Sequence, residues 1–258
     1  LANRRIVFAE GEDERVLHAA RQLMEDGHDT PILIGRPEVI EARLERDGIR
    51  MDLSAIDIIN PESDARYRDY WQAYHKLMRR HGVTPDLARA ILRTNTTVIA
   101  AMMVHLGEAD SMICGTFGEY RWHLKYVNEI LAGADTNPIG ALSHILLDSG
   151  PLFVGDSQVN LFPTPQQIAD TVIGAARHMR RFGIQPRIAL CSSSQFGNLD
   201  TESGRNMRAA LDILDGMDLD FEYEGEMPVD VALDFFLFFF FFPEGRLTGA
   251  ANAMIYAN

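Results

Sequence analysis

The sequence RIALCSSSQFGNLDTESGRNMR, residues 187–208, is the stretch that decides the fold class. Residues 187–191 form a short apolar run after Gln185-Pro186, which predicts a buried strand. A loop rich in hydroxyl groups follows at 192–198, and the pattern from about 204 to 214 predicts a helix. A strand, a polar loop and a helix in this order form ligand sites in open α/β sheets, at the carboxyl ends of the strands.

The polar loop has two possible roles. Its backbone N–H groups and serine hydroxyls can bind a phosphate, a carboxylate or a thioester oxygen. Ser, Asn and Gly are also ordinary turn residues, so a solvated turn is the alternative. Arg205 and Arg208 on the following helix can attract an anion or can belong to a solvated face.

Composition sets the limits for the whole chain. The 258 residues suffice for one large or two modest domains, and 47% hydrophobic with 24% charged residues is typical of a soluble globular protein. The net charge of −13, with no long basic run, argues against nucleic acid and against anionic membrane surfaces as partners. An anionic ligand therefore needs a local group of arginines.

Cysteine and histidine usage exclude some site chemistries. Cys114 and Cys191 each end a predicted strand, which suits a reducing, cytoplasmic interior and gives no disulfide framework. The eight histidines show no metal-binding spacing, so we expect no metal site, and we find no signal peptide or transmembrane run.

The chain begins with Leu1 and ends on an apolar run, so we expect a piece of a longer protein.

The first half of the chain alternates between strand and helix patterns. Strands are predicted at 5–9, 31–34, 56–59 and 111–114. Helices are predicted at 14–26, 37–45, 85–92 and 120–131. Two further helices are predicted to begin at Asp64 and at Thr96 or Thr97. This alternation indicates a mostly parallel sheet that is covered on both faces. The polar loop Gly115-Thr116-Phe117-Gly118 follows the last of these strands, as the serine-rich loop follows 187–191.

A junction at 133–138 divides the chain into two predicted domains, 1–134 and 135–258. In the second domain, apolar runs at 141–147 and 151–154 predict a hairpin, and 253–256 predict a last strand. Thr164-Pro165-Gln166-Gln167 predicts a capping box at the start of a helix.

Residues 235–242 are all Phe except Leu237, which is not an ordinary composition. Eight residues are too few for the ~20 of a membrane helix, and an exposed run of this kind would promote aggregation. The run is therefore either buried in an interface or a placeholder for unidentified residues. We favour the placeholder.

Three stretches together resemble the phosphate acetyl/butyryl-transferase family: RIVFAEGEDERVL at 5–17, ARAILRTNTTVIAAMMVHLGEADSMICGT at 88–116, and VNLFPTPQQIADTVIGAARHMRRFGIQPRIALCSSSQFG at 159–197. GTFGEYRWHLKYV at 115–127 and CSSSQFGNLD at 191–200 are most similar to the carboxyl-terminal domain of bacterial multidomain NADP-dependent malic enzymes. The resemblance implies an α/β fold of two α/β/α domains with mostly parallel sheets, an interdomain cleft that accommodates coenzyme A, and a homo-oligomer.

The resemblance also shows departures from active transferases. Ser192 and Ser194 match the serines of a Ser-x-Ser-Thr-Lys-Gly-Ser type loop, but Phe196 stands where the family has Lys. The family's second loop, with an Asn-Asp-Leu-Ser-Arg-Gly-like motif, does not occur by Asn258. A cation stabilises acyl phosphate and the charge in its transition state, so both departures argue against catalysis by this chain.

Three hypotheses follow from the resemblance. The first is a regulatory and oligomerising domain that binds acetyl-CoA, joined to an amino-terminal malic enzyme module that uses NADP and a divalent metal. The second is an active phosphate acetyltransferase, and the third is a purely structural assembly domain. For the first, we expect no catalytic residue and no metal ligand here. The expected acetyl-CoA site consists of Ser192, Ser193, Ser194 and Gly197 on one wall, Gly115 and Thr116 on the other, and Arg205 and Arg208.

Overall fold

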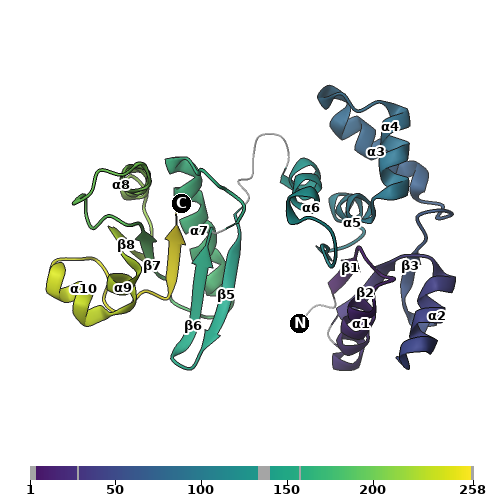
Figure 1. The fold of residues 1–258 in the computed structure, drawn as a ribbon, viewed down its shortest axis with the longest axis horizontal. Coiled ribbons are helices and arrows are strands. Elements are labelled where there is room, and N and C mark those ends of the chain that lie inside the picture. The colour runs from purple at the N-terminus through teal and green to yellow at the C-terminus, as the bar shows by residue number, and fades with distance from the viewer. Residues whose placement is uncertain (1–3, 28, 133–139, 157, 257–258) are drawn as a thin grey trace. The chain divides into compact units, whose positions relative to one another are not determined.

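The computed structural model describes residues 4–27, 29–132, 140–156 and 158–256. Contacts between residues divide the chain into two units, Leu1–Asn137 and Pro138–Asn258, and each unit is described by itself (Figure 1). The predicted junction at 133–138, with the predicted boundary after residue 134, lies outside the described residues.

Unit 1 contains a parallel four-stranded sheet in the order β3-β2-β1-β4. Its strands are β1 (Arg4–Phe8), β2 (Asp29–Ile34), β3 (Asp57–Ile59) and β4 (Ser111–Ile113). The strand order reverses between β1 and β4, because β2 and β3 lie on one side of β1 and β4 lies on the other. Such a reversal places a crevice outside the carboxyl ends of these strands.

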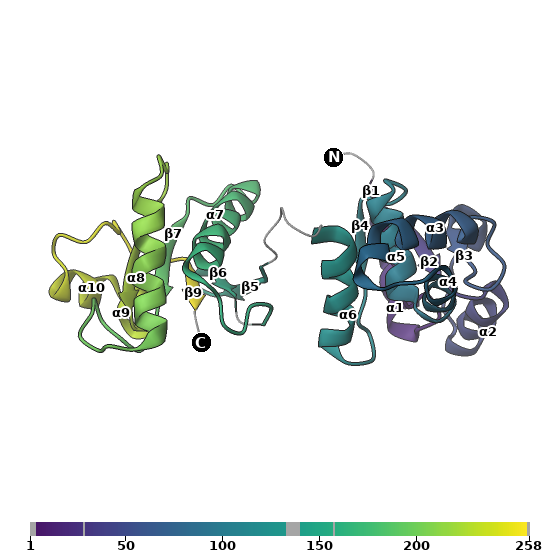
Figure 2. The same ribbon diagram turned by 90° about the horizontal axis from the view of Figure 1, so that it is seen from above.

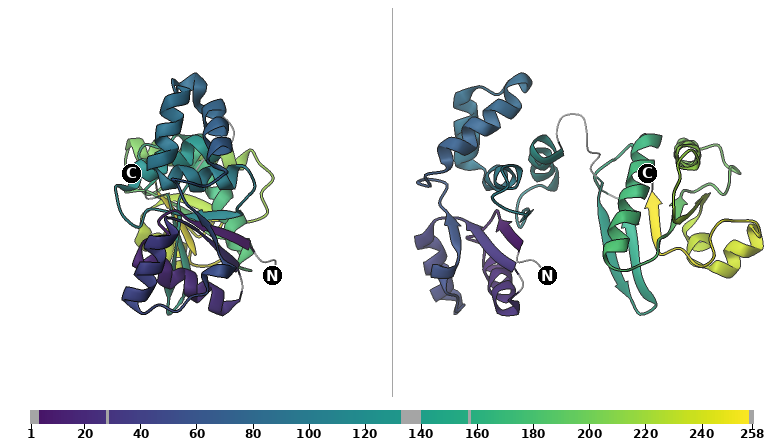
Figure 3. Two further views of the ribbon diagram at one scale, coloured as in Figure 1. Left: turned by 90° about the vertical axis from the view of Figure 1, so that its right-hand side faces the viewer. Right: turned by 180° about the vertical axis from the view of Figure 1, so that it is seen from behind.

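Helices cover both faces of this sheet, as the alternating sequence pattern predicts. The helices of unit 1 are α1 (Glu14–Asp26), α2 (Pro37–Asp47), η1 (Leu53–Ala55), α3 (Tyr67–Met78), η2 (Arg79–His81), α4 (Pro85–Thr94), α5 (Thr96–His105), α6 (Tyr120–Val127) and η3 (Asn128–Ala132). Phe8 packs with α1 and α2 on one face, and its neighbour Val7 packs with α3, α4 and α5 on the other. Side chains alternate along a strand, so β1 contributes to both cores. Figures 1 and 3 show α1 and α2 on one face of the sheet and α3, α4 and α5 on the other.

Two helices of unit 1 differ from the prediction, and a third begins where it was expected. The helix expected from Asp64 begins at Tyr67, because the Asp64 carboxylate accepts a hydrogen bond from Arg66 N in the preceding turn. α5 begins at Thr96, one of the two predicted starts, and Asn95 caps it by accepting from Val98 N. The helix expected at 120–131 ends at Val127 and continues as the π-helical turn η3.

Unit 2 contains a five-stranded sheet in the order β5-β6-β9-β7-β8. Its strands are β5 (Leu142–Leu147), β6 (Gly150–Gly155), β7 (Arg187–Cys191), β8 (Glu222–Met227) and β9 (Ala253–Tyr256). β5 and β6 form the predicted hairpin and are antiparallel, whereas the other pairings are parallel. The mostly parallel α/β architecture of the prediction is therefore confirmed for both sheets.

Two helical layers enclose the second sheet. α7 (Pro165–Arg181) and α8 (Glu202–Asp215) lie side by side and share one core with Phe153, Ile188 and Ile255 (Figure 2). α9 (Val229–Leu233) and α10 (Phe235–Phe241) belong to a second core that includes Ala189 and Cys191. The predicted capping box is present, with Thr164 Oγ1 accepting from Gln167 N and Gln167 Oε1 accepting from Thr164 N.

The phenylalanine run forms α10, which Asp234 caps by accepting from the N–H groups of Phe236 and Leu237. Phe238 is 2% exposed, but Phe236 is 86% and Phe240 is 78% exposed. Packing within unit 2 thus buries only part of the run, and its interpretation as a placeholder remains a prediction. In the described ranges, no helix combines the length and the apolar character needed to span a membrane.

Candidate functional site

The serine loop, defined here as residues 192–199, connects β7 to α8 at the carboxyl end of the second sheet. Ser192 N donates to Met227 O, so the loop begins where the neighbouring strand β8 ends. Ser194 N donates to Ser192 Oγ at 2.9 Å, and Gln195 N donates to Asn198 Oδ1 at 2.8 Å. These bonds between close neighbours fold the loop into a compact turn.

The three serines of this loop lie in different environments. Ser194 is fully buried, and its hydroxyl accepts from Leu199 N at 3.2 Å and donates to Asn198 Oδ1 at 3.3 Å. Ser192 is partly exposed and Ser193 is exposed. Ser194 therefore stabilises the loop from inside, and the Ser192 hydroxyl bonds to the Ser194 backbone, while the exposed Ser193 hydroxyl can meet a ligand.

Glu226, at the end of β8, is the residue that fixes the loop. Its side chain is completely buried, and it accepts from Gly197 N at 2.7 Å and from Arg208 Nη1 at 2.7 Å. Its backbone carbonyl also accepts from Phe196 N at 2.8 Å. One carboxylate thus joins the loop, the helix α8 and the edge strand β8.

The predicted arginines both have acidic partners. Arg205 Nη1 lies 2.5 Å from Asp200 Oδ1, and Arg208 is held by Glu226. The Arg205 pair is exposed to solvent, whereas Arg208 pairs with a buried carboxylate, and anion binding by either arginine stays a prediction. Their charges are balanced within unit 2.

Close packing beneath the loop requires small residues. A Cβ atom on Gly204 would lie 3.2 Å from Glu226 Oε2 and 3.2 Å from Ser194 Cβ.

Phe196 adopts a left-handed backbone conformation with φ of 46°, which is uncommon for a bulky residue. Its ring packs on Phe242, with the ring centroids 3.6 Å apart.

In unit 1, the loop after β4 is tied to the loop after β1 by Glu10. Gly115 N donates to Glu10 Oε1 and Thr116 Oγ1 donates to Glu10 Oε2, both at 3.1 Å. Glu10 is 5% exposed, so its carboxylate relies on these donors. The two predicted residues of unit 1 therefore lie at the point where the strand order reverses, and their donor groups bind Glu10.

His123 supports the same loop from α6. It is 5% exposed, its Nδ1 lies 2.8 Å from Thr97 Oγ1, and its Nε2 lies 2.8 Å from Phe117 O. A carbonyl oxygen only accepts, so Nε2 carries a proton. His123 thereby connects α5, α6 and the loop after β4.

The sequence reasoning did not identify Glu10, His123 or Glu226. The spacing of Glu222, Glu224 and Glu226 in FEYEGEM, every second residue, could have shown that three carboxylates share one face of a strand. Glu222 accepts from Thr248, and Glu224 pairs with Arg246. All three therefore have structural partners.

Comparison with known proteins assigns the family. A profile described as phosphate acetyl/butaryl transferase matches residues 1–258, the whole chain. The chain belongs to this transferase family. It is 46% identical over its full length to an NAD-dependent malic enzyme of Rhizobium meliloti (strain 1021) and 41% identical to the NADP-dependent malic enzyme of Escherichia coli (strain K12). It covers 34% of each of these proteins, so it spans about a third of their length.

Solved structures agree with the assignment to the transferase family. A phosphotransacetylase from Streptococcus pyogenes superimposes with a TM-score of 0.89 at 26% identity, over 99% of this chain and 78% of that one. The family predicted from residues 5–17, 88–116 and 159–197 is therefore confirmed, and the transferase fold extends over the whole chain.

Neither cysteine of this transferase-family chain is an activated nucleophile. Burial raises the pKa of the Cys191 thiol to about 12 and is the main cause that raises the pKa of Cys114 to about 11. A thiolate is the reactive form of cysteine, and both groups remain thiols at neutral pH. Across the described parts of the chain, no group of three or more His, Cys, Asp and Glu residues could hold a metal ion.

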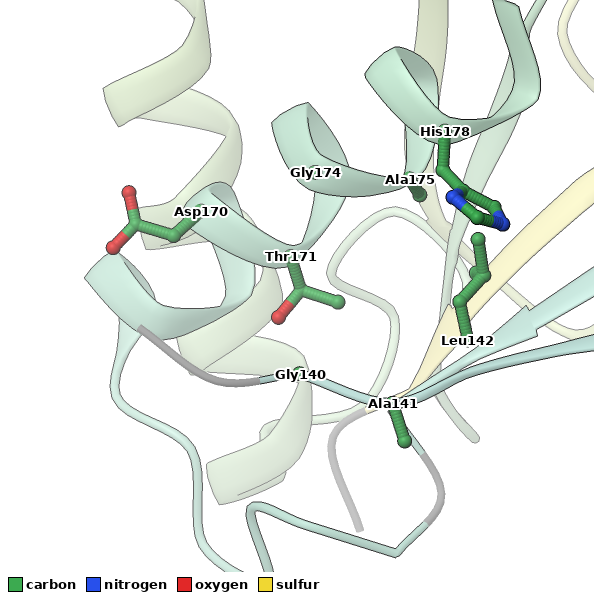
Figure 4. Close-up of a pocket in the computed structure, with 8 residues that line it drawn as sticks. All are labelled: Gly140, Ala141, Leu142, Asp170, Thr171, Gly174, Ala175 and His178. Carbon is green, nitrogen blue, oxygen red and sulfur yellow. The ribbon is translucent and has the colours of Figure 1, made fainter. Parts of the chain in front are cut away.

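A cavity of about 360 Å³ in unit 2 lies between the start of β5 and α7 (Figure 4). It is lined by Gly140, Ala141, Leu142, Asp170, Thr171, Gly174, Ala175 and His178. None of these residues was predicted to bind a ligand. Small and apolar groups form most of this lining, which offers few donors to an anion.

Proposed function

We propose that this chain is the phosphotransacetylase-like domain of an NADP-dependent malic enzyme, and that it binds acetyl-CoA as an effector. The support is the 46% and 41% identity to malic enzymes, of which the chain spans about a third. In such a protein, oxidation and decarboxylation of malate to pyruvate, with NADP and a divalent metal, belong to an amino-terminal module. The Rhizobium meliloti relative is named for NAD and the Escherichia coli relative for NADP. Malate oxidation by the complete enzyme, measured with each cofactor, therefore tests the proposed preference for NADP.

We also propose that this domain does not transfer acetyl groups, because its serine loop and the following helix offer no unpaired cation among the residues expected at the site. Apolar Phe196 stands at the position where the resemblance expects a lysine. Arg205 and Arg208 on the following helix are balanced by Asp200 and Glu226. Loss of one charged group that stabilises a transition state typically costs about 10²-fold or more in rate.

The same loop retains groups that can bind a thioester. Ser193 presents an exposed hydroxyl and Gly197 lies exposed in the same loop, whereas the Ser192 hydroxyl is partly exposed and also bonds to Ser194 within the loop. Ser194, Arg205 and Arg208 support the loop and its helix in this proposal, because their polar groups already have partners. Gly115 and Thr116 shape the loop of unit 1 in the same way, through Glu10.

Calorimetric titration with acetyl-CoA, with CoA and acetyl phosphate for comparison, tests this site. Substitution of Ser194 would disturb a fully buried residue, so the informative variant is Ser193→Trp at an exposed position. We expect Ser193→Trp to weaken acetyl-CoA binding by about tenfold or more, equivalent to ~1.4 kcal/mol. Ser149→Trp, at the exposed turn between β5 and β6, is the matched control and should bind normally. Unchanged binding by Ser193→Trp would remove the serine loop from the site.

An assay of acetyl transfer from acetyl phosphate to CoA separates the alternatives. We expect no measurable turnover, and robust CoA-dependent turnover would instead establish an active phosphate acetyltransferase. Absence of both turnover and acetyl-CoA binding would favour a structural assembly domain.

Regulation requires more than tight binding, because an effector shifts an equilibrium only when it prefers one conformation. The proposal therefore expects acetyl-CoA to change malate oxidation by the full-length enzyme, and Ser193→Trp to suppress that response. A cytoplasmic homo-oligomer is part of the same proposal. Fractionation and sedimentation of the complete protein test it.

A further inference from the structure

We propose that the tip of the α3–α4 helix pair in unit 1 binds the end of α8 in unit 2 of a second copy of this chain. The basic tip is defined by Lys76, Arg79, Arg80 and His81, and the acidic turn by residues 212–220, at the end of α8 and after it. This contact rests on the proposed homo-oligomer and adds to it the two surfaces that meet. It involves no residue of the predicted acetyl-CoA site.

The basic tip concentrates positive charge in an acidic chain. Residues 70–85 contain one lysine, two arginines and two histidines but no Asp or Glu, although the net charge of the chain is −13. The side chains of Lys76, Arg79 and Arg80 are exposed and form no ion pair or hydrogen bond with the described residues. Figures 1 and 3 show α3 and α4 as a pair of helices that extends away from the sheet of unit 1.

Carboxylates of the adjoining elements have other partners. Asp86 in the first turn of α4 pairs with Arg89 at 2.6 Å, and Glu129 in η3 lies 3.8 Å from Lys125 Nζ. The three cations of the basic tip therefore remain available to an acidic partner.

A groove beside the basic tip offers apolar contacts. It encloses about 550 Å³ between the α3–α4 pair and the α6–η3 segment, and its apolar lining includes Met78, Val83, Leu87 and Tyr126. Asn128 also lines it, and its Oδ1 is buried without a hydrogen-bond partner in the described ranges. A buried acceptor without a donor is costly, and a docked peptide segment supplies N–H groups. The groove therefore suits a protein segment that carries an apolar side chain.

The acidic turn has the complementary chemistry. Residues 209–234 contain nine acidic residues and no basic one. Asp212 and Asp218 are exposed, and their carboxylates form no ion pair or hydrogen bond within the part of the chain that the structure describes. The other two aspartates of the turn pair with arginines of unit 2. Met217 is exposed beside Asp218, and a methionine side chain adapts to an irregular apolar groove.

A second copy of this chain supplies the partner, because every copy carries both surfaces. The basic tip and the acidic turn are different patches, so the contact is heterologous and each copy can use both of them. Complementary charge favours the encounter of the two surfaces, and salt weakens this attraction.

Sedimentation of the chain at low ionic strength and in about 0.5 M NaCl tests the contact. We expect association at low salt that weakens in high salt. Arg79→Glu/Arg80→Glu and Asp212→Lys/Asp218→Lys should each weaken it by about tenfold or more, because like charges then face each other. Met217→Ser should weaken the association at both salt concentrations, since it removes an apolar contact.

The matched control is Arg50→Glu/Arg181→Glu, which reverses the same number of charges at exposed positions on other elements. It should associate as the wild type does. An equimolar mixture of the two other double variants provides a further test. One of them keeps its acidic turn and the other keeps its basic tip, so the mixture should associate although neither variant does so alone.

The outcomes separate this contact from the proposed function. Loss of association in both double variants, with recovery in their mixture, supports the contact. Association that survives in both variants, or a mixture that stays dissociated, overturns it and leaves the proposed homo-oligomer to another surface. A wild type that is monomeric at both salt concentrations overturns the contact and the homo-oligomer together. Acetyl-CoA titration of the same variants should give normal binding and reports separately on the effector site.

Discussion

At the scale of single residues, buried carboxylates organise both candidate loops. Glu226 binds a loop N–H and a helix arginine, and Glu10 binds a backbone N–H and a threonine hydroxyl. A buried carboxylate is costly unless its oxygens receive hydrogen bonds. Each loop therefore has a defined position only while its carboxylate and donors are all present.

Glu226→Gln is expected to lower the free energy of unfolding by about 3 kcal/mol, because it removes one member of a buried charge pair. Urea denaturation measures this loss. Glu222→Gln on the same strand is the control, since Glu222 makes exposed bonds to Thr248, and it should cost about 1 kcal/mol or less. Equal losses for the two variants would show that Glu226 has no special role.

The Glu12–Arg36 pair should make stability depend on pH. Hydrogen bonds from Arg36 hold the pKa of Glu12 below its ordinary value of 4.5. The folded state thus binds the proton more weakly than the unfolded chain, and stability is lost as pH falls through the folded pKa. We expect the wild type to be slightly more stable than Arg36→Met at pH 7, and this advantage to shrink below pH ~4.5. A difference that stays constant in urea titrations from pH 7 to pH 3 would contradict this.

At the scale of secondary-structure elements, helix starts follow the sequence closely. Thr84 caps α4 by accepting from Leu87 N, and Thr164 forms the capping box of α7. Both threonines precede a proline at the first helical position, where the absent N–H has no helical partner to lose. Local chemistry alone therefore fixes where these helices begin.

Thr164→Ala should lower the free energy of unfolding by about 1 kcal/mol, because the first turn of α7 loses its cap. Thr171→Ala in the same helix is the comparison, since the Thr171 hydroxyl donates to Gln167 O within the helix and caps no helix start. Thermal unfolding of the two variants distinguishes a cap from an ordinary helical threonine. A larger loss for Thr171→Ala would exclude the capping explanation.

The composition of α10 leads to a separate expectation. Phe236 and Phe240 are 86% and 78% exposed, and exposed phenylalanines of this kind would promote association. We expect the intact mass of the natural protein to differ from the mass given by the sequence, with the difference confined to 235–242. Mass spectrometry of the chain and of its peptides decides this. A mass that matches seven phenylalanines would establish the run as real.

At the scale of the whole molecule, each unit has its own sheet and its own cores. The two cores of unit 1 include residues from Ile6 to Leu131 and none from unit 2. Hydrophobic burial is the main driving force for folding, so a unit that contains its complete core can fold alone.

A fragment that ends at Ala132 is therefore expected to fold. It should show helical circular dichroism and a single cooperative urea transition. A fragment that ends at His105 removes β4 and the loop held by Glu10, and it should lose that cooperativity. Failure of the longer fragment to fold would show that unit 1 depends on unit 2.

Features that depend on neighbouring residues could be predicted from the amino-acid sequence. Apolar runs gave the strands β7 and β9, the hairpin β5–β6 follows from two runs around a short turn, and Thr84 and Thr164 marked helix starts. The family was also recognised from the sequence. These features follow from periodicity, turn chemistry and local hydrogen bonds, which act over a few residues.

The partners of the site residues could not be predicted in this way, because they come from distant parts of the chain. Arg208 bonds to Glu226 across 18 residues, Gly197 across 29, and Gly115 bonds to Glu10 across 105. The sequence showed arginines and serines that could meet an anion, but it did not show which of them already have partners. Pairing across such distances depends on which strands become neighbours in the sheet, and local sequence patterns do not contain that information. For this reason the serine loop was predicted and its carboxylate anchor was not.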